Sequence, residues 1–475
     1  MVIDMNTHTK ALKKLLPKAI ITDDKAELEA YKDIIYVHEP SRAQLVVRPG
    51  SYEEVSKLLG YCDRHNLAVA PWGGGTNLSG SLTPSRSFVA LDIKGLNKVL
   101  DFSEDNWTVT VQAGATIEKI ENYLNKRGFT LGHDPWSKAS ATIGGAIALD
   151  SAGNLYPKYG SAGDLVLSIK VAVVDGRILT LGGPISKSSS SPRMSCLFIG
   201  SAGTLGVILE ATMKIAPLAA EHATSGYAFS SFKKMFYAIK ELDKAGLTPQ
   251  SYIGGTLPSV AIKLQPKTEQ ALVKMLGIDS ALFIYYEGNA EDVKVRLKAA
   301  KNLLSGFGKK MPDKYAASWW ENRHTYFEMN KELADENIHL HVFDFCIPKD
   351  MVLTAYTRMD EIAKKQKLEK RISHSLFSAL DAYTVALYLE DSKEGMASLR
   401  RFEKEAISEV HNLKGTIART HGLGSLYSSR AIIEKEIGKD ALDLLEKMKR
   451  TLDPNNILNP GILIRGHEDG GKRRS

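Results

Sequence analysis

The stretch "PWGGGTNLSG", residues 71–80, places three consecutive glycines directly after a short apolar run. The preceding "LAVAP" (67–71) is typical of a strand. Glycine loses side-chain packing and conformational entropy, but it permits positive φ angles and close backbone approach. Successive N–H groups can then point into one concavity that suits an anion such as a phosphate. From this stretch alone, a phosphate-binding loop and a plain surface turn both remain open.

The spacing of these glycines matches neither G-x-G-x-x-G nor G-x-x-x-x-G-K-[ST], so a phosphate bound here implies a different fold. Two more glycine clusters follow, "GHDPWSKASATIGGAIALDSAGNLYPKYGSAGD" (132–164) and "LFIGSAGTLGVILEATMKIAP" (197–217). Their glycines stand between apolar strands, where glycine marks a bulge or a close approach of backbone to a ligand. Three such clusters favour a ligand site over three unrelated turns.

The composition excludes several classes of protein. The 475 residues, 43% apolar and 25% charged, allow two or three ordinary globular domains. The net charge of +7 comes from scattered basic residues, so no nucleic-acid partner is expected. Because the three cysteines are far apart and form no C-x-x-C, we expect no disulfide framework, zinc site or iron–sulfur cluster, and a cytoplasmic location. We expect no membrane span, while peripheral association at the inner face of a membrane stays open.

The predicted pattern of strands and helices changes twice along the chain. After an N-terminal arm, residues up to 217 alternate between strands and helices, with a capped helix start at Ser51–Glu54 and a hairpin turn at Asp175-Gly176. Residues 218–424 show the order strand, helix, helix, strand, which suggests an antiparallel sheet with helices on one face. Residues 425–475 form a mainly helical C-terminal segment.

Six segments occur together in a fixed order: "VVRPGSYEEV", "PWGGGTNLSG", "DPWSKASATIGGAIA", "GTLGVILEATMKIAP", "HGLG" and "LDPNNILNPG". In these segments the chain resembles the vanillyl-alcohol oxidase/PCMH superfamily of FAD proteins. The branch is that of D-lactate dehydrogenase, glycolate oxidase subunit and alkyldihydroxyacetonephosphate synthase. The resemblance implies an α+β fold. It has a two-part PCMH-type FAD-binding domain (1–217), an antiparallel-sheet substrate (cap) domain with helices on one face (218–424), and a C-terminal segment (425–475) that returns to the FAD domain.

The resemblance also assigns the glycine clusters to FAD. The first would cradle the pyrophosphate, the second would follow the ribityl chain and isoalloxazine, and the third would hold the adenine side and the ring edge. Some relatives attach FAD through a histidine of the first loop; Thr76 stands there in this chain, so non-covalent FAD is expected. The implied cofactor residues are Pro71, Gly73, Gly74, Gly75, Thr76, Asn77, Leu78, Ser79, Pro135, Thr142, Gly144, Gly145, Ser151, Gly153, Gly203, Thr204, Gly206, Val207 and Ile208.

The resemblance implies oxidation of a small 2-hydroxy acid of the D-lactate or glycolate type. This reaction requires a cation that binds the carboxylate and a base that accepts the hydroxyl proton. It also requires flavin N5 facing the substrate carbon to take the hydride. Arg323, in "WWENRHTY", matches a substrate-domain arginine of the family and is the predicted carboxylate clamp. His421, in "ARTHGLG", is the predicted base or orienting group. His374 and Tyr383 complete the catalytic candidates, and Arg419 is a secondary one.

Two departures from the family pattern bear on the reaction. Metal-dependent relatives carry G-H-x-G-D-G-N-x-H and a later Glu; this chain lacks the downstream His and has Thr420 in place of Glu, so no metal is expected. The alkyl-transferring synthases carry three consecutive histidines, where this chain reads Arg419-Thr420-His421.

Three hypotheses therefore stand. The first is an oxidoreductase that passes electrons to a quinone, a carrier protein or oxygen. The second is a redox-neutral transferase like alkyldihydroxyacetonephosphate synthase, and the third is a non-catalytic FAD-binding subunit. A homo-oligomer, as a dimer, is expected.

Overall fold

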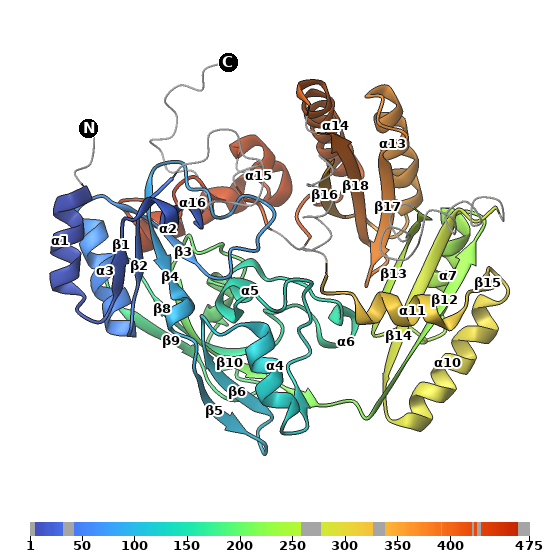
Figure 1. The fold of residues 1–475 in the computed structure, drawn as a ribbon, viewed down its shortest axis with the longest axis horizontal. Coiled ribbons are helices and arrows are strands. Elements are labelled where there is room, and N and C mark those ends of the chain that lie inside the picture. Colours follow the sequence, from blue (N-terminus) through green and yellow to red (C-terminus); the bar gives the residue numbers. More distant parts are fainter. Residues whose placement is uncertain are drawn as a thin grey trace.

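The structure is a computed structural model that describes residues 5–31, 42–257, 277–325, 338–390, 392–419, 422–424 and 429–463 (Figure 1). Strands and helices are mixed, and most strand pairs are antiparallel. The predicted α+β class is therefore confirmed. The predicted domain boundaries at 217 and 424 stay predictions.

The first sheet combines parallel and antiparallel strands. Its order is β1 (Ile20–Thr22), β2 (Ala43–Arg48), β4 (Phe88–Asp92), β3 (Ala68–Trp72), with β2, β4 and β3 parallel and β1 antiparallel to β2. The helices of this part are α1 (Met5–Leu15), α2 (Lys25–Glu29), α3 (Tyr52–Arg64) and the short 3-10 helix η1 (Ile93–Gly95).

Helix α3 begins where the sequence predicted, because the Ser51 side chain accepts a hydrogen bond from the backbone N–H of Glu54. The Glu54 carboxylate does not complete a capping box; it accepts from the N–H groups of Gly50 and Lys18 instead. Val55, Leu58 and Leu59 are fully buried. Burial of each such side chain stabilises the fold by about 1.5–3 kcal/mol.

The second sheet is antiparallel throughout. Its order is β5 (Val99–Ser103), β6 (Thr108–Gln112), β10 (Val207–Lys214), β8 (Val166–Ala172), β9 (Ile178–Gly182), and the β8–β9 pair confirms the hairpin predicted at Asp175-Gly176. A further pair joins β7 (Phe129–Thr130) to β11 (Ala216–Pro217). The helices of this region are α4 (Ile117–Asn125), α5 (Ile143–Leu149), α6 (Tyr156–Tyr159) and η2 (Met194–Leu197).

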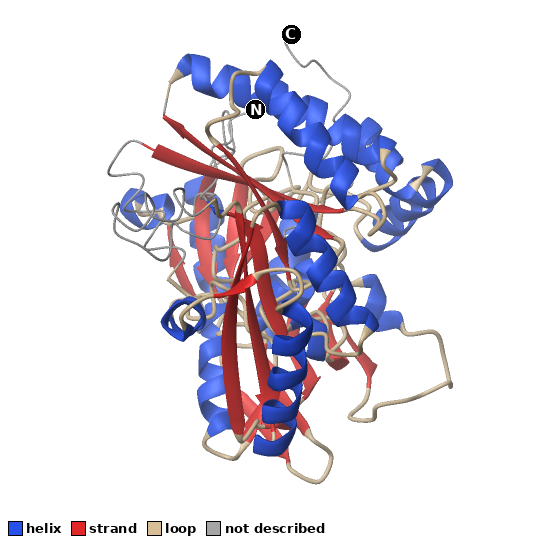
Figure 2. Cartoon of the chain, turned by 90° about the vertical axis from the view of Figure 1, so that its right-hand side faces the viewer, coloured by secondary structure: helices blue, strands red, loops and turns tan. Residues whose placement is uncertain are grey.

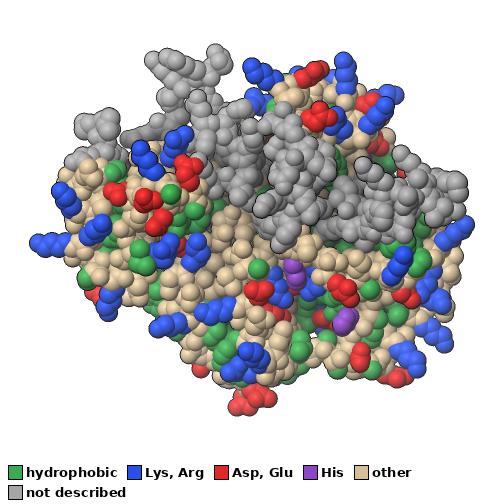
Figure 3. Space-filling model, viewed as in Figure 1, with side chains coloured by type: hydrophobic (Ala, Val, Ile, Leu, Met, Phe, Trp, Pro, Cys, Tyr) green, Lys and Arg blue, Asp and Glu red, His purple; other side chains and the backbone are tan. Residues whose placement is uncertain are grey.

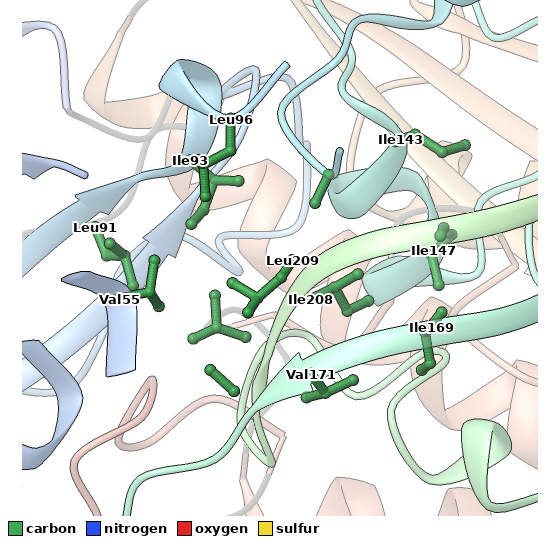
Figure 4. Close-up of a cluster of buried hydrophobic side chains, with 14 of the residues drawn as sticks. Val55, Leu91, Ile93, Leu96, Ile143, Ile147, Ile169, Val171, Ile208 and Leu209 are labelled. Atoms are coloured by element: carbon green, nitrogen blue, oxygen red, sulfur yellow. The ribbon is translucent and has the colours of Figure 1, made fainter. Parts of the chain in front are cut away.

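One hydrophobic core joins the first two sheets. It takes Val55 from α3, Leu91 from β4, Ile147 from α5, Val171 from β8 and Leu209 from β10, and Figure 4 shows these side chains pointing toward one another. The glycine loops leave the ends of strands anchored in this core, so their backbone positions are fixed by packing.

The third sheet has seven antiparallel strands. Its order is β15 (Lys309–Lys310), β12 (Glu221–Phe229), β14 (Ser280–Gly288), β13 (Ser251–Thr256), β17 (Ile372–Phe377), β18 (Ala382–Glu390), β16 (Ile338–Cys346). Four long helices run along its strands (Figure 2): α7 (Phe232–Lys244), α10 (Ala290–Leu304), α13 (Val352–Lys365) and α14 (Lys393–Asn412).

The two faces of this sheet have different neighbours. Along β14, Leu282, Ile284 and Tyr286 join a cluster with residues of the four long helices. The alternate residues Phe283 and Tyr285 pack instead with Trp319 and Trp320 of α11 (Asp313–Glu321) and with Leu155 next to α6. This two-residue alternation is the normal consequence of the pleat. One face is thus covered by helices, and the other looks toward the N-terminal half of the chain.

The C-terminal segment reaches the first sheet. After α15 (Arg430–Ile437) and α16 (Lys439–Leu452), the N–H of Val69 in β3 donates to the carbonyl of Ile457 at 2.8 Å, and the N–H of Asn459 donates to that of Val69 at 2.9 Å. Charged side chains of both signs are scattered over the face seen in Figure 3. Over the described ranges, no helix has the length and apolar character needed to cross a membrane.

Candidate functional site

A large cavity lies where the three glycine clusters meet the seven-stranded sheet. The first loop lines it from Pro71 to Leu78, the second cluster contributes from Pro135 to Asn154, and the third contributes from Ala202 to Ile208. Nearly every predicted cofactor residue is thus brought to one place. Ser79 and Thr204 lie behind the lining: Ser79 donates to Asn77 Oδ1 at 2.8 Å, and Thr204 donates to the Ser201 carbonyl at 2.7 Å.

The first loop needs glycine because it presses against the second cluster. A Cβ on Gly73 would lie 2.3 Å from Thr142 Oγ1, and one on Gly74 would lie 2.0 Å from the Ser140 carbonyl oxygen. Gly75 also has φ +69°, in the left-handed region. Among the described residues, the N–H groups of Gly73, Gly74, Gly75 and Thr76 have no hydrogen-bond partner. Four adjacent free donors beside a cavity suit an anionic ligand.

Side chains of the C-terminal segment donate hydrogen bonds to backbone carbonyls of the third glycine cluster. Lys449 in α16 is buried, and its Nζ donates to the carbonyls of Thr204 and Leu458 at 2.8 Å each and to Asp453 at 2.5 Å. Asn459 Nδ2 donates to the Ala202 carbonyl at 2.7 Å. Burial lowers the pKa of Lys449, while the adjacent Asp453 carboxylate opposes that shift.

The glycine-lined end of the cavity fits FAD. The unpaired amide groups of the first loop supply donors for a pyrophosphate, and the glycines bring backbone close to a ligand in three places. Within the described parts of the chain, no residue that lines the cavity is a histidine, cysteine or tyrosine. The same parts contain no cluster of three or more His, Cys, Asp or Glu side chains arranged to bind a metal ion.

The other end of the cavity is formed by the sheet. Its strands contribute Ile253, Val342, Asp344, Ser375, Phe377 and Thr384, and Arg419 lies beside them. Arg419 is the only Arg or Lys among the described lining residues. Its Nη2 donates to the Phe377 carbonyl at 2.8 Å, and Asp344 accepts from Thr384 Oγ1 at 3.0 Å. Among the described residues, the sheet end of the cavity thus carries one cation, Arg419, and one carboxylate, Asp344.

His374 and Tyr383, two predicted catalytic residues, lie on the opposite face of this sheet. His374 Nδ1 is 2.5 Å from the Tyr383 hydroxyl, and its Nε2 is 2.9 Å from Asp360 on α13. Their neighbours Ser375 and Thr384 line the cavity, so the pleat turns His374 and Tyr383 into the helix-covered core. Burial raises the pKa of Tyr383 well above its usual range. The structure therefore does not bring these two residues to the cavity.

Arg323, the predicted carboxylate clamp, is engaged with another residue of the chain. It follows α11, its guanidinium stacks on the Trp320 ring at 3.9 Å, and its Nε lies 2.7 Å from Asp134. His324 Nε2 reaches the same carboxylate at 2.9 Å, and Asn154 Nδ2 donates to it at 2.9 Å. Arg323 is not among the residues that line the cavity.

Asp134 is the centre of this joint between α11 and the loop before α5. Its burial alone would raise the pKa, but the hydrogen bond from His324 and the charges of Arg323 and Lys138 outweigh burial and hold the pKa well below its usual range. The neighbouring His133 is fully desolvated, which lowers its pKa to about 4 and keeps it neutral near pH 7. From Asp134 the hydrogen bonds continue through Asn154, whose carbonyl accepts from Ser378 at 2.9 Å.

His421 and Thr420 lie outside the described residues. Sequence reasoning missed Asp344, Asp134 and Asn459 as parts of the site. The strand "HLHVFDFC" carried a signal for Asp344, since a lone carboxylate in an otherwise apolar stretch of strand marks a face that is not simple core. Asp134 and Asn459 stand in two of the segments that carry the family resemblance, but nothing in the sequence indicated their partners, which are distant along the chain.

Comparison with known proteins identifies both halves of the chain. The model for the FAD binding domain matches residues 43–182, and the model for the C-terminal domain of FAD linked oxidases matches residues 218–463. Alkyldihydroxyacetonephosphate synthase of Trypanosoma brucei brucei is 22% identical over 96% of this chain and 83% of its own length. D-lactate dehydrogenase [cytochrome] 1 of Saccharomyces cerevisiae is 26% identical over 94% and 77%, and glycolate oxidase subunit GlcD of Bacillus subtilis is 26% identical over 89% of each.

Solved structures show the same fold. An alkyldihydroxyacetonephosphate synthase aligns with a TM-score of 0.76 at 21% identity, covering 97% of this chain and 86% of that one. p-Cresol methylhydroxylase aligns with a TM-score of 0.80 at 17% identity, covering 97% of each. The predicted fold and FAD cofactor are therefore confirmed, while relatives with different substrates are comparably similar.

Proposed function

Because the chain belongs to the family of FAD-linked oxidases, we propose that it is an FAD-dependent oxidoreductase acting on a small 2-hydroxy acid of the D-lactate or glycolate type. The observation that carries the substrate class is Arg419, the one described cation in the cavity lining. Its planar guanidinium suits the two oxygens of a carboxylate. Two relatives named for D-lactate and glycolate support the same class.

Arg419 takes the role that the sequence assigned to Arg323. The Arg323 guanidinium is held by Asp134 and the Trp320 ring, whereas Arg419 uses one Nη2 bond to a backbone carbonyl and lies along the cavity. A carboxylate bound to Arg419 would lie near Phe377 and Trp136, whose rings meet edge to face at 5.3 Å. Those rings cover the apolar part of a small substrate and exclude water.

The reaction removes two hydrogens from the substrate and gives a 2-oxo acid. Bound FAD would supply the acceptor for the hydride that leaves the substrate carbon. The hydroxyl proton needs an acceptor of this chain, and we propose His421, from the sequence pattern, and Asp344, the carboxylate of the cavity lining. Thr384 donates to Asp344 and fixes its orientation. A quinone, a carrier protein or oxygen is proposed to reoxidise the cofactor.

Non-covalent attachment of FAD is part of the proposal. Covalent attachment requires a side chain such as histidine, cysteine or tyrosine beside the flavin, and the described lining residues include none. Thr76 stands at the first-loop position where some relatives carry a linking histidine. The cofactor should then appear in the supernatant after acid precipitation of the protein.

The second candidate is a redox-neutral alkyl transfer. One specific observation favours it: the chain matches the alkyldihydroxyacetonephosphate synthase of T. brucei brucei over nearly its whole length. Arg419 would then bind a phosphate rather than a carboxylate, since its chemistry suits both anions.

Kinetics of the Arg419→Met variant test the clamp. Loss of charge-assisted hydrogen bonds worth about 1.5–3 kcal/mol should raise KM for a hydroxy acid by roughly ten- to hundredfold, with FAD content unchanged. Arg371→Met is the matched control, because Arg371 forms an exposed pair with Glu390 on the same sheet. An unchanged KM in Arg419→Met would remove Arg419 from substrate binding.

A further inference from the structure

A row of polar side chains crosses the cavity wall at the sheet end. Ser375 on β17 is paired with Thr384 on β18, and Thr384 is paired with Asp344 on β16. All three residues line the cavity. Side chains paired directly across antiparallel strands point to the same face of the sheet, with neighbouring strands about 4.8 Å apart. The row therefore presents two hydroxyl groups and one carboxylate, side by side, to a bound molecule.

The Ser375 hydroxyl is available to a ligand. Thr384 Oγ1 donates to Asp344 at 3.0 Å, whereas Ser375 Oγ has no hydrogen-bond partner in the described part of the chain. Ser375 is 7% exposed, and its Oγ is not enclosed by protein as the unpaired Ser251 Oγ is. Because Ser375 lines the cavity, its hydroxyl can both donate to and accept from a molecule bound there.

Arg419 lies beside the same strand, two residues further along. Its Nη2 donates to the Phe377 carbonyl at 2.8 Å, and Phe377 lies on the same face of β17 as Ser375. Two residues of a strand span about 6.7 Å. A three- or four-carbon acid can bridge such a distance with a hydrogen bond at each end. An acid whose carboxylate is bound by Arg419 would thus have its far end beside Ser375.

We propose that the Ser375 hydroxyl binds a second hydroxyl group of the substrate, which makes the substrate a 2,3-dihydroxy acid of the glycerate type. This inference rests on the proposed function, because the position of the carboxylate comes from Arg419. The hydride still leaves C2, and the proton still leaves the C2 hydroxyl. The second hydroxyl stays in the product, a 3-hydroxy-2-oxo acid.

An apolar substrate chain fits this row less well. It would cover the Asp344 carboxylate and the Ser375 hydroxyl without replacing the hydrogen bonds that water makes to them. The neighbouring rows are apolar: Ile253 is paired with Phe377 on the side of Arg419, and Val342 lies two residues from Asp344 on the other side. A substrate hydroxyl shifted toward either of these rows would meet an apolar side chain, so the second hydroxyl is restricted to the row of Ser375.

Glycerate and lactate differ by one hydroxyl group, so this pair of acids isolates the contact. The readout is the ratio of the second-order rate constants for anaerobic flavin reduction by glycerate and by lactate, measured with both stereoisomers of each acid. In wild type we expect a ratio of roughly ten or more in favour of glycerate, the effect of one hydrogen bond whose protein partner is otherwise left unpaired.

Two serine variants of β17 assign the preference to its residue. Ser375→Ala should bring the ratio close to about one, since the contact is removed for both acids alike. Ser373→Ala is the matched control and should leave the ratio unchanged, because Ser373 lies on the same strand but is fully buried and does not line the cavity.

A wild-type flavin that lactate reduces as readily as glycerate does would overturn the proposal, and this result does not depend on any variant folding. A preference for glycerate that Ser375→Ala retains would overturn it as well. Both results leave the proposed hydroxy-acid oxidation intact. A flavin that no 2-hydroxy acid reduces would instead refute the proposed function, and this inference with it.

Discussion

Replacing Asp134 by asparagine should loosen the joint between α11 and the loop that leads into α5. The Asp134 side chain is 5% exposed and meets Arg323 at 2.7 Å and His324 at 2.9 Å. Asparagine has nearly the same shape, so the substitution removes the charge while leaving the packing in place. Arg323, only 17% exposed, would then lose its counter-charge.

The magnitude follows from the burial of this pair. Removing one partner of a buried ion pair costs about 3–5 kcal/mol, and the residual exposure of Arg323 and His324 places the expected cost near the lower end. Because each 1.4 kcal/mol is a factor of ten, a loss of about 3 kcal/mol makes local opening of α11 roughly a hundredfold more frequent.

Hydrogen–deuterium exchange of the 313–325 region, read by mass spectrometry, measures that opening. We expect amides of α11 to exchange roughly a hundredfold faster in Asp134→Asn than in wild type. Asp175→Asn is the control, because Asp175 pairs with Arg177 on the surface, where both side chains are largely exposed and solvent screens the pair. Unchanged exchange in α11 of a folded Asp134→Asn protein would show that the Asp134 charge does not hold α11 in place.

Three further predictions concern buried polar groups. Tyr383→Phe removes the hydroxyl beside His374 Nδ1 and should lower the free energy of unfolding, measured by urea denaturation, by about 1–3 kcal/mol. Turnover should not change, since both residues face away from the cavity. A large loss of turnover with intact stability would contradict that placement. Burial lowers the pKa of His133 to about 4 in the folded protein, so the unfolded chain binds a proton at this residue first, at its ordinary pKa of 6.5. The free energy of unfolding should therefore fall by about 3 kcal/mol as the pH drops from above 6.5 toward 4. His133→Gln should remove this part of the pH dependence, and identical stability–pH profiles for the two proteins would disprove it. Lys449→Met leaves Asp453 buried without its counter-charge and should lower the free energy of unfolding by about 3–5 kcal/mol; an unaffected denaturation midpoint would show that the pair is not needed.

The sequence predicted the cofactor end of the site better than the substrate end. The glycine clusters are local signals, since three glycines between apolar strands restrict what the backbone can do there. The structure accordingly gathers most of the predicted cofactor residues around one cavity. The fold class and the β8–β9 hairpin were accessible for the same reason, because strand and turn patterns are local.

The substrate end depends on information that the sequence does not hold locally. His374 and Tyr383 lie one residue away from cavity-lining positions, and a shift of one residue turns a strand side chain to the other face. Arg323 and its partner Asp134 are 189 residues apart, so nothing near Arg323 indicated that its guanidinium was already engaged. Arg419 becomes the first candidate for binding the substrate only once the cavity that it lines is known.

Anaerobic reduction of the bound flavin is the decisive measurement for hydroxy-acid oxidation by this protein. The purified protein is mixed with D- and L-2-hydroxy acids in the absence of oxygen, and the visible absorption of the flavin is recorded. We expect one class of these acids to bleach the flavin in wild type, and Arg419→Met to need a much higher concentration of the same acid. A flavin that no hydroxy acid bleaches would contradict the proposed oxidation and favour the redox-neutral transfer.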